Sequence, residues 1–139
     1  AQIAVGMDYA VTVCDPREEY RDGWHVDGVN VVHAMPDDLV VEMKLDSRSA
    51  VVALTHDPKI DDPGLDAALK SDCFYIGALG SRKTHARRVE RLKAERGFND
   101  NDIGRIHSPI GLDIGSVSPA EIAVAIIGEI TAALRQEPA

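Results

Sequence analysis

The sequence predicts an α/β protein built in three layers, with helices on both faces of a mainly parallel sheet. Short runs of β-branched residues alternate along the chain with longer stretches that carry apolar residues at helical spacing. The run at 50–55 (AVVALT) is apolar almost throughout, which is typical of a central parallel strand covered on both faces. With 139 residues, the chain has the length of one domain, 1–139. We therefore expect a Rossmann-like α/β/α fold.

Four segments are predicted to be strands and four to be complete helices. The expected strands cover residues 10–14, 29–33, 50–55 and 73–77. The expected helices cover residues 36–44, 63–69 and 81–96 and a final stretch that begins at 118. Residues 1–7 (AQIAVGM) are predicted to be the back half of a further helix.

Residues typical of helix boundaries support these assignments. Asp61 or Asp62 is expected to cap the second helix, and Gly97 is expected to end the third. Ser118 precedes Pro119 and, three positions on, an acidic residue, which is a typical helix start.

The composition excludes several classes of protein. The hydrophobic share of 45% is ordinary for a globular chain, and no run approaches the roughly 18 apolar residues of a membrane span. No secretory leader pattern opens the sequence, and two cysteines are too few for a disulfide scaffold, so we expect a reduced, cytoplasmic protein. The net charge of −8 argues against nucleic-acid binding.

The basic residues are concentrated in one segment. Residues 82–96 hold seven Lys and Arg against two Glu, a net charge of +5, so the rest of the chain carries −13. Such a segment is most often a solvated helix face, but it can also attract anions to an acidic protein.

The segment 77–85 (GALGSRKTH) is the strongest candidate for a binding site. It follows a predicted strand, at the sheet edge where open parallel sheets bind ligands. Gly77 and Gly80 free the backbone, and Gly80 can bring its N–H group to a ligand. Ser81 can cap the helix or donate to an anion, Arg82 adds charge, and the helix N-terminus favours phosphate. The alternative is a tight turn followed by an exposed basic helix.

A second cluster follows the predicted strand at 50–55. We expect Thr55, His56 and Asp57 to face a ligand, because they lie at the same sheet edge. No metal site is predicted here, since the spacing fits no standard zinc pattern.

The two cysteines, Cys14 and Cys73, lie in predicted strands and are expected to be buried, inert thiols, with a reactive sulfur-carrying thiol as the alternative.

Two further segments bear on the site. The stretch 108–115 (SPIGLDIG) cannot be a regular element, so it either shapes the route into the last helix or forms a second pocket wall that includes Asp113.

Asp15 ends the first predicted strand, where a dinucleotide-binding fold places its ribose-binding acid. The matching glycine-rich turn would lie about 20 residues earlier, before residue 1. Either the first strand and loop are missing, or the sheet begins here and Asp15 is a turn residue.

Several motifs in this order resemble the C-terminal Rossmann domain of the XdhC/CoxI family, the xanthine dehydrogenase accessory proteins. They are VTVCDPREEY, LTHDPKIDD, FYIGALGSRKTHARR and HSPIGLDIG followed by SPAEIAVAIIGEI. The resemblance covers nearly the whole chain. Chains of this family also carry a separate N-terminal domain and a glycine-rich turn that this sequence lacks, so we expect a fragment of a longer chain.

The resemblance implies a function. Members of the family serve molybdenum hydroxylases such as xanthine dehydrogenase, bind the molybdenum–molybdopterin cofactor, receive its terminal sulfur from a sulfurase and pass it to the apo-enzyme. The resemblance thus implies a cofactor-insertion chaperone rather than an enzyme, with Gly80, Ser81 and Arg82 on a phosphate of molybdopterin. Its expected partners are the client hydroxylase and the sulfurase, and a missing strand would favour a homodimer.

Two other functions fit the same fold. An NAD(P)-linked oxidoreductase, or a subunit of one associated with xanthine dehydrogenase, would need a complete glycine-rich loop upstream. A purely interactive module would dock the face formed by Arg87, Arg88 and Arg91 on an acidic patch of a partner, and its binding would weaken with salt.

Overall fold

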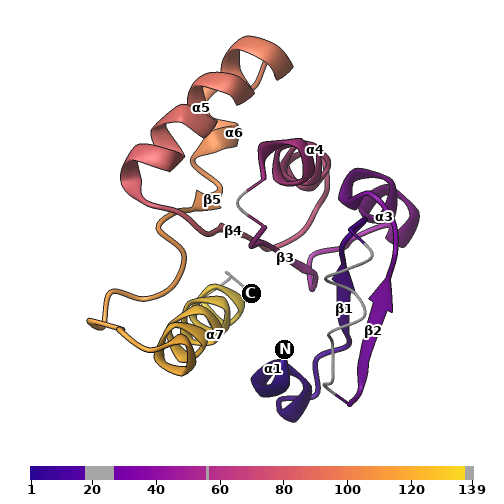
Figure 1. Cartoon of the computed structure of the whole chain (residues 1–139), viewed down its shortest axis with the longest axis vertical. Coiled ribbons are helices and arrows are strands. Elements are labelled where there is room, and N and C mark those ends of the chain that lie inside the picture. The colour runs from indigo at the N-terminus through magenta and orange to yellow at the C-terminus, as the bar shows by residue number, and fades with distance from the viewer. Residues whose placement is uncertain (18–26, 56, 137–139) are drawn as a thin grey trace.

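The computed structural model describes residues 1–17, 27–55 and 57–136. All strand pairs in these ranges are parallel, as predicted, but they form two sheets (Figure 1). One sheet pairs β1 (Val11–Cys14) with β2 (Val29–Val32), and the other has the order β3 (Ala50–Ala53), β4 (Tyr75–Ala78), β5 (Ile106–His107). The prediction of one sheet is therefore corrected, because no ladder joins β1 to β3 in the described ranges.

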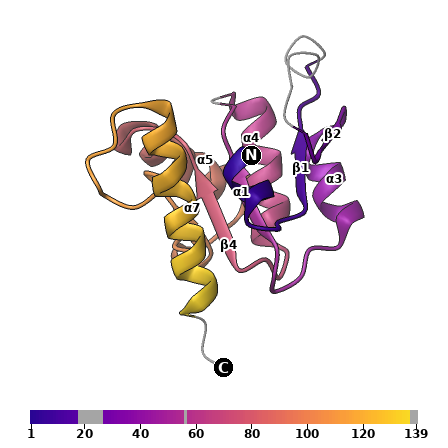
Figure 2. The same ribbon diagram turned by 90° about the horizontal axis from the view of Figure 1, so that it is seen from below.

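Helices cover the strands on two sides, which confirms the three-layer α/β class. They are α1 (Gln2–Gly6), α3 (Pro36–Met43), α4 (Pro58–Leu69), α5 (Arg82–Arg96), α6 (Asp100–Ile103) and α7 (Pro119–Arg135). Figure 1 shows α3, α4 and α5 on one side of the strands and α1 and α7 on the other. Figure 2 shows the molecule from the side of α1 and α7, which contact each other.

The core lies between the second sheet and helices α4 and α5. Leu65 and Ala68 of α4, Ile76 of β4 and Leu92 of α5 are almost completely buried in one cluster. The residues of β1 are mostly only half-buried. The second sheet is thus the well-packed part of the molecule, and the loop after β4 leaves directly from it.

The start of α4 differs from the prediction. The helix begins at Pro58 and not at Pro63, and its N-cap is Asp57, whose Oδ1 accepts from the Lys59 amide at 3.0 Å. Asp61 and Asp62 therefore lie inside the helix, so their prediction as caps was wrong. Proline suits the first helical position, and Pro58 takes that place five residues before Pro63.

The boundaries of α5 and α7 confirm the predicted signals. Ser81 caps α5, and Gly97 ends it with φ +74°. The side chains and amides of Ser118 and Glu121 form a reciprocal capping box on α7. Two short elements, α6 and β5, were not predicted.

Candidate functional site

The turn between β4 and α5 is shaped by a glycine with positive φ. The Leu79 amide donates to the Ala53 carbonyl at 2.9 Å, which holds the start of the turn against β3. Gly80 has φ +143°, and a Cβ at this position would lie 3.1 Å from Cγ2 of Thr84. Both the backbone conformation and the close approach of Thr84 favour glycine here, as expected for Gly80.

The first turn of α5 keeps two amides without a partner. The Ser81 hydroxyl oxygen accepts from the Thr84 amide at 3.1 Å, so Ser81 acts as the helix cap. The amides of Arg82 and Lys83 lie at the start of the helix, where no preceding helical carbonyl is available to accept from them. No residue that the structure describes accepts a hydrogen bond from them. The turn is therefore not closed by internal bonds, and two N–H groups remain for an anion.

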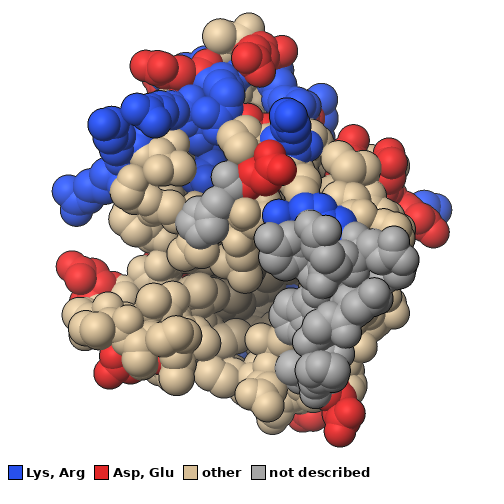
Figure 3. Space-filling view, in the orientation of Figure 1, with Lys and Arg blue, Asp and Glu red and all other residues tan. Residues whose placement is uncertain are grey.

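Three exposed cations lie in the first two turns of α5. Arg82, Lys83 and Arg87 make no ion pair with any described carboxylate, and the first turn of α5 holds no acidic residue. Figure 3 shows Lys and Arg gathered over this part of the molecule. Positive charge at a helix N-terminus is unfavourable without an anion, so the arrangement is suited to binding one.

The remaining cations of α5 are paired with acids in most cases. Arg91 Nε donates to Asp62 at 2.7 Å, Arg96 Nη1 donates to Asp66 at 2.8 Å, and Lys93 pairs with Asp100. The C-terminal half of the helix is thus paired with acids, whereas Arg82, Lys83 and Arg87 of the N-terminal half are exposed.

Arg88 departs from the prediction of an exposed docking face, because only 3% of it is exposed. Its Nη2 donates to the Leu79 carbonyl at 3.0 Å, and its Nη1 lies 3.3 Å from His85 Nδ1. Because arginine only donates, that His85 nitrogen accepts, and the ring is neutral. Burial, with a smaller effect of Arg88, lowers the pKa of His85. The sequence does carry a signal for this burial, since Arg88 lies one helical turn before the fully buried Leu92.

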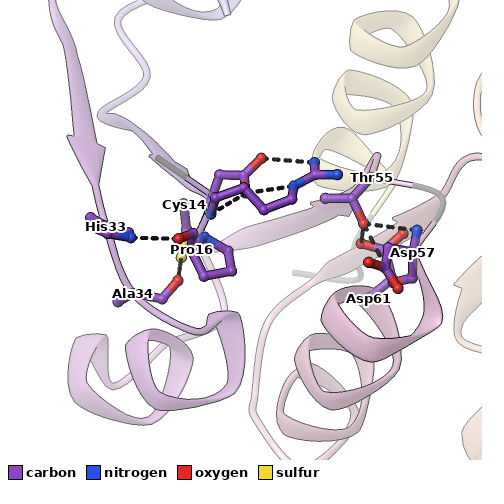
Figure 4. A network of polar contacts seen from close by, with 9 residues as sticks. Cys14, Pro16, His33, Ala34, Thr55, Asp57 and Asp61 are labelled. Carbon is purple, nitrogen blue, oxygen red and sulfur yellow. Dashed lines mark hydrogen bonds and ion pairs between the residues drawn. The ribbon is translucent and has the colours of Figure 1, made fainter. Parts of the chain in front are cut away.

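Thr55 and Asp57 lie beside the turn but bind within the protein. The Thr55 hydroxyl donates to Asp61 Oδ1 at 2.7 Å and accepts from the Asp57 amide at 3.1 Å (Figure 4). The Asp57 carboxylate caps α4. Because β3 and β4 pair Ala53 with Ala78, Thr55 and Gly80 follow neighbouring strand ends. His56 lies outside the described residues.

Asp15 lies at the end of β1, in the other sheet. Arg17 binds both oxygens of its carboxylate, from Nε at 3.0 Å and from Nη2 at 2.9 Å, and the Arg17 amide adds a third bond. These hydrogen bonds from Arg17 hold the pKa of Asp15 below its usual range despite burial. Figure 4 shows the neighbouring contacts of Cys14 with Ala34 and of Pro16 with His33.

Asp113 and Gly77 do not contact the open amides. Asp113 is exposed on the irregular 108–118 loop, which is held to α7 by the Leu112 amide on the Ala125 carbonyl. Gly77 is buried, and a Cβ there would lie 2.5 Å from Ile110 Cδ1. Packing therefore explains the glycine at position 77.

The described ranges offer neither a metal cluster nor a membrane-spanning helix. They contain no group of three or more His, Cys, Asp or Glu that could hold a metal ion. No helix within them is long and apolar enough to cross a membrane.

Comparisons with known proteins agree on one family. Residues 1–130 match the family described as "XdhC Rossmann domain". The chain is 33% identical over 95 residues to the molybdenum cofactor insertion chaperone PaoD of Escherichia coli, covering 68% of this chain and 30% of that protein. It is 29% identical over 131 residues to a probable xanthine dehydrogenase subunit of Bacillus subtilis, covering 94% of this chain and 37% of that protein.

A solved structure has the same fold. A crystal structure of a xanthine dehydrogenase from Bacillus halodurans superposes with a TM-score of 0.78 at 25% identity, covering 98% of this chain and 38% of that one. The chain thus spans about a third of the length of the relatives that it matches.

Proposed function

The chain belongs to the XdhC family, whose Rossmann domain matches residues 1–130, and from this premise we propose that it binds the molybdenum cofactor for insertion into xanthine dehydrogenase-type hydroxylases. The names of the relatives from E. coli and B. subtilis support both the cofactor and the client. In this proposal, residues 1–139 form the Rossmann module of a longer protein, which carries the cofactor and does not transform it. A sulfurase is the proposed source of the terminal sulfur.

The observation that carries the proposal is the open turn at the start of α5. Molybdopterin carries a phosphate, and its nucleotide form carries two. The unpartnered Arg82 and Lys83 amides and the exposed Arg82, Lys83 and Arg87 side chains supply donors and charge for such a group. Gly80 places no side chain at the turn, where a Cβ would lie 3.1 Å from Thr84 Cγ2. The residues present therefore fit a phosphate-bearing cofactor.

The roles of the other proposed residues follow from their positions. Ser81 holds the first turn of α5 in shape, and Thr55 and Asp57 hold the neighbouring start of α4. Both turns lie at the carboxyl ends of paired strands, so together they would form one side of a pocket. His56, Gly77, Asp113 and Asp15 belong to the proposed site on the sequence argument alone.

The NAD(P) alternative has less support. A ribose-binding carboxylate must offer free acceptor positions to a ligand, whereas Arg17 takes three of the roughly four on Asp15. NAD(P) binding stays a prediction of the fold, and the contacts of Asp15 do not favour it.

Replacing Arg82 with alanine in the complete protein tests the proposal. We expect retention of the molybdenum cofactor to fall about tenfold or more, because hydrogen bonds to charged groups contribute roughly 1.5–3 kcal/mol. The measurement is molybdenum and pterin content after gel filtration. Lys93→Ala, which removes a cation that is paired with Asp100 near the other end of α5, serves as the control. Equal retention by Arg82→Ala and the wild type would contradict the assignment.

A further inference from the structure

We propose that the buried guanidinium of Arg88 forms the floor of this anion site, and that the site therefore selects a multiply charged phosphate over a singly charged anion. The inference deepens the proposed function and rests on it, because it names the chemical class of the group that is held at the turn. It adds a residue that lies behind the loop and not on its exposed surface.

The position of Arg88 places its charge directly beneath the turn. Its Nη2 donates to the carbonyl of Leu79, the residue before Gly80. The same Nη2 lies 3.7 Å from the point where a Cβ of residue 80 would stand. A Cβ at position 80 would stand against this nitrogen, whereas glycine places no side chain between Arg88 and the turn.

The guanidinium also lacks an acceptor. Arg88 Nε is buried, and no described residue accepts a hydrogen bond from it. Buried donors are nearly always paired, because an unpaired one forfeits its hydration without compensation. In the planar guanidinium, Nε–H shares an edge with one of the two hydrogens of Nη2, the nitrogen that donates to Leu79. An acceptor on this edge would lie close to the turn, and a phosphate oxygen would supply it.

The charges around Arg88 favour an anion with more than one negative charge. Among the described residues, no carboxylate hydrogen-bonds to Arg88; Asp62 is taken by Arg91, and Asp61 binds Thr55. Burial, with a smaller effect of Arg91, lowers the pKa of Arg88, although the nearby Asp61 and Asp62 carboxylates raise it. Arg82, Lys83 and Arg87 add three exposed charges without carboxylate partners in these ranges. A single negative charge would leave this cluster strongly positive.

The test is a titration of the chain with inorganic pyrophosphate, inorganic phosphate and acetate, followed by NMR of the amide and arginine Hε signals. We expect pyrophosphate to shift the Gly80, Arg82 and Lys83 amides and the Arg88 Hε, with at least tenfold tighter binding than acetate. Arg88→Gln should weaken pyrophosphate binding about tenfold. Lys93→Gln, which removes one charge from the same helix, should change it less than twofold.

A second variant distinguishes a loss of pyrophosphate binding from a loss of folding. Arg88→Lys keeps the buried charge but loses the planar fork, so it should fold and still bind pyrophosphate several-fold more weakly. If wild-type pyrophosphate binding leaves the Arg88 Hε signal unmoved, or if Arg88→Lys binds as tightly as the wild type, the inference is overturned. Failure of the proposed function would look different, because pyrophosphate would bind through Arg88 while the complete protein retained no molybdenum cofactor.

Discussion

At the scale of single residues, the sequence is most informative where a residue acts on its immediate neighbours. Gly80, Ser81 and Gly97 could be predicted, because positive φ and helix capping depend on a few adjacent positions. The burial of Arg88 and the pairing of Asp15 with Arg17 could not, because they depend on which surfaces the fold brings together. The first group builds the turn, and the second determines which charges remain available to a ligand.

Cys14 provides a prediction at this scale. Its thiol donates to the Ala34 carbonyl at 3.0 Å, and burial, together with the nearby Asp15 and Asp37 carboxylates, raises its pKa. Because the thiolate is the reactive form, we expect iodoacetamide at pH 8 to modify Cys14 several-fold more slowly in the native chain than in urea. Mass spectrometry of the Cys14 peptide measures both rates. A native rate equal to or above the unfolded rate would instead favour a sulfur-carrying thiol.

At the scale of elements, capping motifs located α5 and α7 correctly, whereas α4 was misplaced. Pro58 and Pro63 both suit a helix start, and the choice between them depends on the contact of Asp57 with the Lys59 amide. The elements α6 and β5, with four and two residues, are too short for hydrophobic periodicity to reveal. The facing ends of β4 and α5 were predicted to within one residue, whereas the start of α4, on the other side of the proposed pocket, was not.

Gly77 of β4 gives the prediction for this scale. A methyl group there would meet Ile110 and Tyr75 at 2.5 and 2.8 Å, so Gly77→Ala should lower the free energy of unfolding by about 1–3 kcal/mol. Urea denaturation measures the change. Gly6→Ala is the matched control, because a Cβ at position 6 has no atom within 4 Å. If Gly77→Ala proves as stable as the wild type, packing does not account for this glycine.

At the scale of the whole molecule, the alternation of strands and helices predicted the parallel α/β class and its layers. It did not predict that the strands divide into two sheets, since alternation does not specify which strands lie side by side. The concentration of positive charge in residues 82–96 was visible in the sequence. Only the structure shows that its N-terminal half is unpaired with described carboxylates, whereas Arg91, Lys93 and Arg96 bind acids. This separation leaves the N-terminal end of α5 positively charged on an otherwise acidic protein, as the proposed anion site requires.

A crystal structure of the chain grown with pyrophosphate tests the central claim most directly. The account predicts phosphate density within hydrogen-bonding distance of the Arg82 and Lys83 amides, with Arg88 Nε directed toward it. Pyrophosphate bound elsewhere on the surface, with the turn at Gly80 empty at saturating concentration, would contradict it.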